Sequence, residues 1–341
     1  MSPLKLAAAL LAAAAVAAPT ASADQPHPFA GDRQVTVLTR NLFLGTDLAP
    51  IFGAPSLPAL FGAVAAGYAD VQASNVHDRM AAVADEIAAA QPDLVGLQEA
   101  ALYRTDVPAD GPATPSETTT IDFLDELLDA LEGRGQSYEV VARFDGTDAE
   151  LPAGLPPRMD VRFTDRIAIL ARTDETTADL KLSDPQTGAY ATQLGLSTVG
   201  GPIAVKRGWA SVDIKIRGKS FRFVTTHLEA FSGAVRKAQA AELAASLPDD
   251  AVVVGDFNAG PGKDLVAYDT LIGGGLADAW PDGPATCCRK LTESKPLTSR
   301  IDLVLTRGGF DTVATDVVSN RTPGGLWASD HAGVVATLRL P

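Results

Sequence analysis

The chain has 341 residues, and its 42 Asp and Glu residues against 28 Lys and Arg residues give a formal net charge of −14. A field of that sign does not attract a phosphate backbone at long range, so the charge argues against nucleic-acid binding without excluding it. The hydrophobic content of 46% is enough for one large core, and no Pro-, Gly- or Ser-rich linker divides the chain.

Residues 1–23 have the pattern of a secretory signal peptide. One lysine precedes an apolar run over residues 6–18, and Ala21-Ser22-Ala23 forms a small-x-small cleavage site. The run is too short for a membrane span, and no later stretch approaches spanning length. We therefore expect cleavage after Ala23, a secreted protein without a transmembrane segment, a tail over residues 24–34 and one domain over residues 35–341.

The first strand–helix–strand unit begins with RQVTVLTRN, a predicted strand that ends on Asn41. A helix is predicted over residues 76–91, and Pro92 stops it before the strand DLVGLQEA, which ends at Glu99. The apolar residues of the helix recur on one face, which we expect to be buried: Met80, Val83, Ala84 and Ile87. His77, at the helix start, is expected to lie at the surface or to cap the helix.

A long apolar connection, residues 42–74, follows Asn41. One interpretation is a lid or lip over a site at the strand end. The other is that the segment packs on the core, and helical spacing favours it for four apolar residues: Leu57, Leu60, Phe61 and Val64.

A second unit repeats the plan, with the strand SFRFVTTHLEA, the helix AVRKAQAAELAASL and the strand VVVGDFNAG. The last strand ends on Asp256 and Asn258, two residue types that strands disfavour. Because side chains alternate with period two, both project from one face. Together with Asn41, Glu99 and His227, Asp256 lies at the carboxyl end of a strand, the edge where open α/β sheets place ligands.

Three later segments complete the pattern. DRIAILAR is a strand, and KRGWASVDIKIRGKSFRFV is a hairpin that turns at residues 217–219 and carries its basic residues on a solvated face. SRIDLVL is a strand with Arg300 and Asp302 on one face. Asp330 and His331 stand immediately before the last strand.

The two cysteines, Cys287 and Cys288, are adjacent. An exported protein can form disulfides, but neighbouring Cα atoms lie closer than the usual bridge range, so a strained vicinal bond and two free thiols both stay open. No C-x-x-C or H-E-x-x-H motif accompanies them, and neither cysteine is predicted as a nucleophile or a zinc ligand.

The polar residues at the strand ends are rich in oxygen and lack a thiolate, which favours a hard cation: Mg²⁺, with Mn²⁺ or Ca²⁺ as substitutes. Such a cation, with Asn, His and Arg donors, stabilises charge on a phosphoryl transition state, while an Asp–His pair takes a proton from water. His227 and His331 both adjoin strand ends and carboxylates. The residues therefore predict phosphoester hydrolysis.

Six segments in this order, TRNLFLG, VGLQEA, TTHLEA, VVVGDFNAG, SRIDLVL and SDHAG, resemble the endonuclease/exonuclease/phosphatase superfamily from about Val35 to Leu340. The resemblance implies an α/β (α+β) fold of the deoxyribonuclease I type: a four-layer sandwich of two mixed β-sheets flanked by helices, with the site between the sheets.

The resemblance also implies roles. Glu99 is the main metal ligand, Asn41 lies beside it, and Asp330 sits by the metal or supports His331. Asp256 orients or activates water, and Asn258 holds the phosphate or its nucleophile. His227 stabilises the transition state. His331 is the general base, positioned by Asp302.

Weaker candidates for phosphate contact are Tyr103 and Arg104, which follow the Q-E motif and could equally lie on a helix surface. Arg166 is a third weak candidate for phosphate contact, and Arg166 and Asp165 are weak candidates for a partner of His227.

Three hypotheses for function stay open. Export, acidity and the apolar connection favour a phosphodiesterase that acts on a phospholipid or small diester. An extracellular nuclease is the second, because the superfamily is broad. A non-catalytic binding module is the third, since fold does not imply function. No protein partner is predicted, and the substrate, the number of metals and the oligomeric state stay open.

Overall fold

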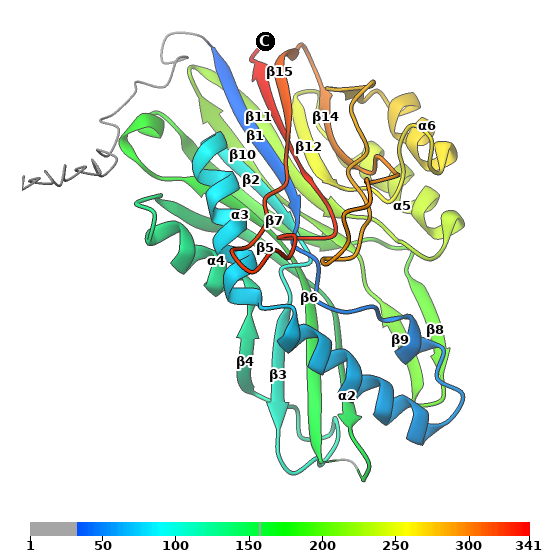
Figure 1. The fold of residues 1–341 in the computed structure, drawn as a ribbon. Coiled ribbons are helices and arrows are strands. Elements are labelled where there is room, and N and C mark those ends of the chain that lie inside the picture. Colours follow the sequence, from blue (N-terminus) through cyan, green and yellow to red (C-terminus); the bar gives the residue numbers. More distant parts are fainter. Residues whose placement is uncertain (1–32, 157) are drawn as a thin grey trace, which may run out of the picture.

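The computed structural model describes residues 33–156 and 158–341 (Figure 1). The predicted signal peptide, its cleavage site and all but the end of the predicted tail lie outside the described residues. Within the described part of the chain, no helix is both long enough and apolar enough to cross a membrane.

Two mixed sheets pack face to face. The larger has the strand order β15-β16-β1-β2-β6-β3-β4, with β5 also paired to β6, and the smaller has the order β13-β14-β12-β11-β10-β7. The larger sheet comprises β1 (Gln34–Asn41), β2 (Leu94–Gln98), β3 (Leu102–Asp106), β4 (Thr118–Asp122), β5 (Tyr138–Ala153), β6 (Met159–Arg172), β15 (Asp311–Val318) and β16 (Gly333–Arg339). The smaller comprises β7 (Lys181–Ala189), β10 (Gly208–Ile216), β11 (Lys219–His227), β12 (Ala251–Asp256), β13 (Ala277–Asp278) and β14 (Asp302–Arg307). A separate hairpin is formed by β8 (Leu194–Thr198) and β9 (Gly201–Val205).

Helices cover the outer face of each sheet (Figure 1). On the larger sheet lie α1 (Ala49–Phe52), α2 (Leu57–Ala73), α3 (Val76–Ala90) and α4 (Phe123–Glu132), and on the smaller lie α5 (Gly233–Ser246) and α6 (Leu265–Gly273). A short 3₁₀ turn, η1 (Glu175–Thr177), connects β6 to β7. The predicted four-layer sandwich is confirmed.

The valine strand β12 shows how alternation assigns side chains to layers. Val252 and Val254 are buried in the core between the sheets, whereas Val253 packs under α5 and α6. Every residue of β12 is buried, as expected for a strand covered on both faces. By the same alternation, Asp256 leaves the strand end on the face between the sheets.

Gly96 in β2 lies at a close approach of the two sheets. A Cβ at this position would overlap the side chains of Val254 and Thr225 in the facing sheet. Glycine therefore lets β2 and β12 come together directly beneath the polar residues that end these strands.

Several element predictions are confirmed and several are corrected. The four apolar residues predicted on one face of α3 are all fully buried. Leu60 and Val64 of α2 pack on the core, but Leu57 is 47% exposed. Tyr103 and Arg104 lie on strand β3 rather than on a helix. His77 is exposed and bonds Glu126, as expected for a surface residue.

Candidate active site

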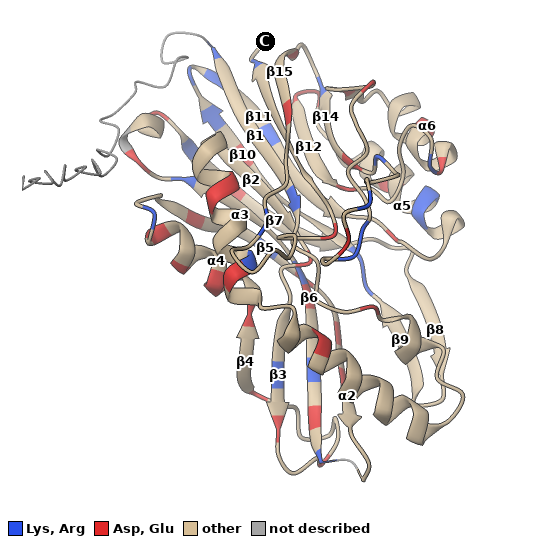
Figure 2. Ribbon diagram, in the orientation of Figure 1, with Lys and Arg blue, Asp and Glu red and all other residues tan. Residues whose placement is uncertain are grey.

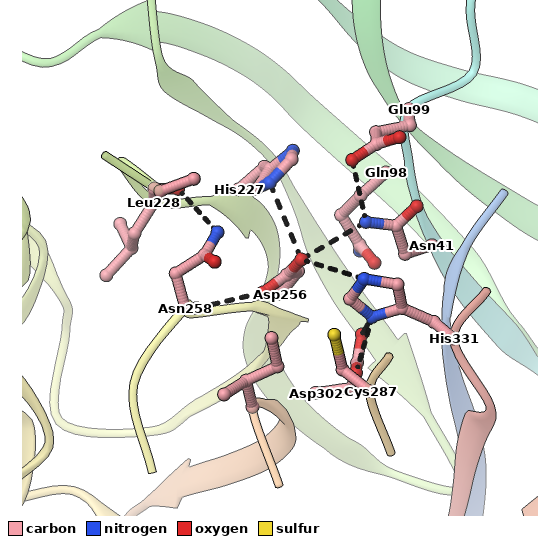
Figure 3. Close-up of polar contacts among 12 residues, drawn as sticks. Asn41, Gln98, Glu99, His227, Leu228, Asp256, Asn258, Cys287, Asp302 and His331 are labelled. Atoms are coloured by element: carbon pink, nitrogen blue, oxygen red, sulfur yellow. Dashed lines mark hydrogen bonds and ion pairs between the residues drawn. The ribbon is translucent and has the colours of Figure 1, made fainter. Parts of the chain in front are cut away.

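Strand register brings the predicted residues to one edge. In the parallel pair β1 and β2, Asn41 lies beside Gln98, and in the parallel pair β11 and β12, His227 lies beside Asp256. In the antiparallel pair β12 and β14, Asp256 lies opposite Asp302. The side chains meet between the two sheets, where Figure 3 shows them around Asp256.

Glu99 reaches this cluster because its backbone departs from strand geometry. Continued alternation would turn its side chain toward the helices, but Glu99 has φ 53° and the carboxylate swings back. Asn41 Nδ2 donates to Glu99 Oε1 at 3.1 Å and to Asp256 Oδ2 at 3.1 Å. The backbone N–H of Leu44 donates to Glu99 Oε2 at 2.7 Å. One amide thus joins the carboxylates of both sheets.

Asp256 is the centre of the cluster. Its Oδ1 accepts the N–H of Asn258 at 2.8 Å, and the Asn258 amide donates to the carbonyl of Leu228 at 3.1 Å. Burial raises the pKa of Asp256 to about 7, with a further rise from the carboxylates of Asp302 and Glu99 and opposition from His331. A buried carboxyl group with like-charged neighbours resists ionisation unless a cation compensates it.

His331 and Asp302 form a buried pair. His331 Nδ1 lies 2.8 Å from Asp302 Oδ2, which leaves Nε2 directed toward Asp256 Oδ2 at 3.7 Å. Burial alone would lower the pKa of His331, but the carboxylates of Asp302, Asp330 and Asp256 outweigh it and hold the pKa well above its usual value. Asp302 is fixed in turn, because its N–H donates to Thr286 Oγ1 at 3.1 Å.

His227 differs from His331 in that its pKa is lowered rather than raised. Its Nδ1 lies 2.8 Å from Arg207 Nη1, and because a guanidinium only donates, Nδ1 accepts and the proton is on Nε2. Burial, the charge of Arg207 and that of His331 lower the pKa of His227 well below its usual value. Its 3.5 Å approach to Asp256 Oδ2 is therefore a contact of a neutral N–H donor and not an ion pair.

Arg207 is the residue that sequence reasoning missed. The hairpin's basic residues were expected on a solvated face, yet Arg207 is 9% exposed and also bonds Asp165 Oδ2 at 2.9 Å. Asp165 thus supports His227 through Arg207, whereas Arg166 does not contact the histidine. No local motif marks Arg207, since it directly precedes a strand and its partners are 42 and 20 positions away.

Asp330, the residue before His331 in the chain, also approaches the ring of this histidine. Its Oδ1 accepts from Ser329 Oγ at 3.3 Å and is 4.0 Å from His331 Nε2. Burial raises the pKa of Asp330 to about 6, and Glu99 adds to that rise.

These donors suit a divalent cation. Asp256, Asp302 and His331 place ligand atoms within 4.8 Å of one another. His331 Nδ1 already bonds Asp302, whereas Glu99 and Asp330 offer the oxygen donors that a hard cation prefers. A divalent ion there would offset the negative charge that helps to raise the pKa of Asp256 and Asp330. The carboxylates fit the predicted metal.

The three predicted phosphate-contact residues already have protein partners. Tyr103 is buried, and its hydroxyl donates to the carbonyl of Leu44 at 2.8 Å. Arg104 bonds Thr164 and Asp148. Arg166 is 3% exposed and bonds Asp122 and two backbone carbonyls. The structure brings none of the three into the cluster around Asp256.

Cys287 and Cys288 are joined to each other as a vicinal disulfide, and Cys288 Sγ lies 3.8 Å from His331 Nε2. Arg300, predicted on one face with Asp302, pairs instead with Asp278 at 2.7 Å.

Comparisons with known proteins relate the chain to one family of folds. Residues 203–331 match the model of the Endonuclease/Exonuclease/phosphatase family. No curated protein matches the sequence. Among solved structures, the fold is similar to an endonuclease/exonuclease/phosphatase family protein from Bacteroides thetaiotaomicron, with TM-score 0.57, 16% identity, and 91% of this chain and 99% of that chain covered.

Two further structures have the same fold. D. rerio TDP2 complexed with a single-strand DNA product has TM-score 0.54 and 16% identity, covering 90% of this chain and 99% of that one. The Bacteroides thetaiotaomicron mannosyl-6-phosphatase Bt3783 has TM-score 0.53 and 18% identity, covering 89% and 99%.

The resemblance seen in the sequence is confirmed: the chain has the deoxyribonuclease I-like fold of endonuclease/exonuclease/phosphatase proteins, and residues 203–331, which include His227, Asp256 and His331, match the family model. Members of this family are divalent-metal-dependent hydrolases that act on phosphoester bonds.

Proposed function

We propose that the protein is an exported, Mg²⁺-dependent phosphodiesterase that hydrolyses a phospholipid or another small non-nucleic diester. The observation that carries the hydrolytic part is the cluster around Asp256. Two histidines face this carboxylate, His331 with a raised pKa and His227 with a lowered pKa. The sequence pattern of residues 1–23 supports export. The acidic charge and the apolar segment beside Glu99 support the substrate class.

Each side chain has a distinct task in this proposal. A divalent cation held by Glu99, with Asp330 and Asn41 beside it, would polarise the phosphoryl oxygens. His227 donates its Nε2–H to an oxygen that gains charge, and Asn258 donates its second amide N–H to the phosphate or accepts a hydrogen bond from the nucleophile through its amide oxygen. Asp256 orients the attacking water.

His331 Nε2 takes the proton from that water, and Asp302 holds the ring through Nδ1. His331 acts as a base only after it has lost its own proton. Its raised pKa therefore predicts that activity increases with pH.

A nuclease is the second candidate, and one feature favours it. Arg289, whose N–H donates to the carbonyl of Asp330 at 3.2 Å, forms a cationic cluster with Arg321 beside the site. However, the two guanidinium carbons lie 3.3 and 3.8 Å from the ring centroid of Trp327, and both fit only if they cover opposite faces. Trp327 then has no free face on which a base could stack.

The test is phosphoester turnover by the purified protein with Mg²⁺, run in parallel on phosphatidylcholine or sphingomyelin micelles, a soluble bis-aryl phosphate and plasmid DNA. Asp256→Ala serves as the blank. We expect cleavage of the lipid or the soluble diester and no nicking of DNA. Nicking of DNA alone would support the nuclease, and absence of metal-stimulated turnover on every substrate would support a binding module.

A further inference from the structure

Two adjoining cavities extend from the site toward α2, and the one farther from the site is apolar. The first, of about 40 Å³, reaches Glu99 and Arg207. The second, of about 60 Å³, extends to Val64 and Tyr68 of α2. The two share four wall residues: Leu48, Phe52, Thr147 and Phe163. The space thus begins among the charged groups of Glu99, Asp165 and Arg207 and becomes apolar farther from them.

The second cavity has few groups that could form a hydrogen bond with water. None of its described wall residues carries a charge, and of the four hydroxyl-bearing residues in its wall all but Thr46 have protein partners. The hydroxyl of Tyr68 donates to Thr120 Oγ1 at 2.9 Å, that of Tyr103 donates to the carbonyl of Leu44, and Thr147 Oγ1 accepts the N–H of Lys206 at 2.9 Å. One free hydroxyl is fewer than the two to four polar partners that a buried water needs, so the cavity favours apolar groups over water.

The apolar character continues to the surface. Phe231, four positions after His227, is 57% exposed, and its ring meets that of Phe52 edge-to-face at 5.9 Å. Leu48 and Phe52 are only half-buried. Figure 2 shows no charged residue on β8 or β9 and few on α2. Phe231 and Phe52 therefore form an apolar rim between solvent and the first cavity.

We propose that the two cavities bind an alkyl chain attached to the scissile phosphate, so that the enzyme selects phosphoesters of linear aliphatic alcohols. The inference rests on the proposed function, because the phosphate must sit at Glu99 for its chain to enter here. The apolar wall of the second cavity disfavours a sugar or a base, because their hydroxyl and amide groups would lose hydrogen bonds to water without gaining hydrogen bonds to the protein. Each methylene that enters should tighten binding about fourfold until the space is filled.

Binding can be measured without turnover, by calorimetry with monoalkyl phosphates from methyl to octyl phosphate in the presence of Mg²⁺. We expect affinity to rise by a total of about 10²-fold or more and then level off. Ala149→Leu and Ile203→Phe each add volume inside the second cavity, from different walls. Both should shorten the chain length at which affinity levels off and leave methyl phosphate binding unchanged. Thermal unfolding shows whether each variant is folded. If one of the two misfolds, the other still tests the inference.

Ala204→Leu is the matched control, because Ala204 is the exposed neighbour of Ile203 on β9. It should keep the chain-length dependence of the wild type. Equal affinity for methyl and octyl phosphate in the wild type would overturn the inference, even if the enzyme turns over diesters. The wild type could instead show chain-length-dependent binding that the filling variants shorten, with no turnover of any ester. That result would support the cavity site and overturn the proposed function.

Discussion

Arg207 Nη1 lies 2.8 Å from His227 Nδ1, and this single contact fixes which ring nitrogen of His227 carries the proton. A guanidinium cannot accept a hydrogen bond, so Nε2 is the donor and faces the cluster around Asp256. The buried arginine also disfavours a charged imidazole. Arg207 is therefore a positioning residue for a neutral hydrogen-bond donor.

Replacement of Arg207 by Met should lower kcat by about 10- to 100-fold with a smaller change in KM, because the tautomer of His227 is no longer fixed. The pKa of His227 should rise, which NMR titration of the ring can follow. Arg222→Met is the control, since Arg222 bonds only peripheral residues of β7 and β10. An unchanged His227 titration in Arg207→Met would contradict the assignment.

Asp302→Asn tests the pair with His331. Loss of the carboxylate removes the first of the charges that raise the pKa of His331, so the pKa should fall. The rising limb of the pH–kcat profile should move to lower pH, and the plateau should drop by about 10²- to 10⁴-fold because the ring is no longer held. Profiles from pH 5 to 10 measure both effects. A limb that stays in place would show that His331 is not the base.

Glu99→Gln should weaken binding of Mg²⁺ or Mn²⁺ by at least about 10-fold, because a carboxylate ligand becomes neutral. Calorimetric titration of the metal-free protein measures this loss directly. In the wild type, added Mg²⁺ should raise Tm and a chelator should reverse the rise, since a ligand that binds only the native state stabilises it. Glu117→Gln, at a 77% exposed side chain, should retain the wild-type affinity.

The ion pair that Arg166 forms with Asp122 should stabilise the fold rather than serve the reaction. Asp122→Asn keeps an oxygen to cap α4 but leaves the buried guanidinium without its counter-charge, which should cost about 3 kcal/mol. Denaturant unfolding at pH 7 measures the loss, and Asp125→Asn in the same helical turn is the control. Turnover should be unchanged, and a large loss of kcat in a folded Asp122→Asn protein would instead tie Arg166 to the reaction.

That pair also predicts a pH dependence. Burial alone would raise the pKa of Asp122, but the hydrogen bonds and charge of Arg166 outweigh it and lower the pKa. A depressed folded-state pKa gives stability that is present above the unfolded value of about 3.9 and is lost as pH falls through the folded value. The stability difference between wild type and Asp122→Asn should therefore be constant near neutrality and shrink below about pH 4.

The sequence by itself determined the residues that end the central strands. Asn41, Glu99, His227 and Asp256 are polar interruptions of apolar strand patterns, and period-two alternation is a local property that can be read without knowing the fold. The helical spacing of apolar residues identified α3 in the same local way, and an alanine-rich segment identified α5. Six ordered motifs then indicated the superfamily and its sandwich.

Only the tertiary structure decided which partners those residues have. Arg207 was expected in solvent and instead holds His227, while Arg166 was a candidate for the site and instead pairs with Asp122. Both contacts join residues at least 20 positions apart, through side chains whose direction depends on how two sheets pack. The cavities beside Glu99 likewise depend on the docking of α1, α2 and β9 against β5 and β6, a volume left between elements that no sequence period encodes.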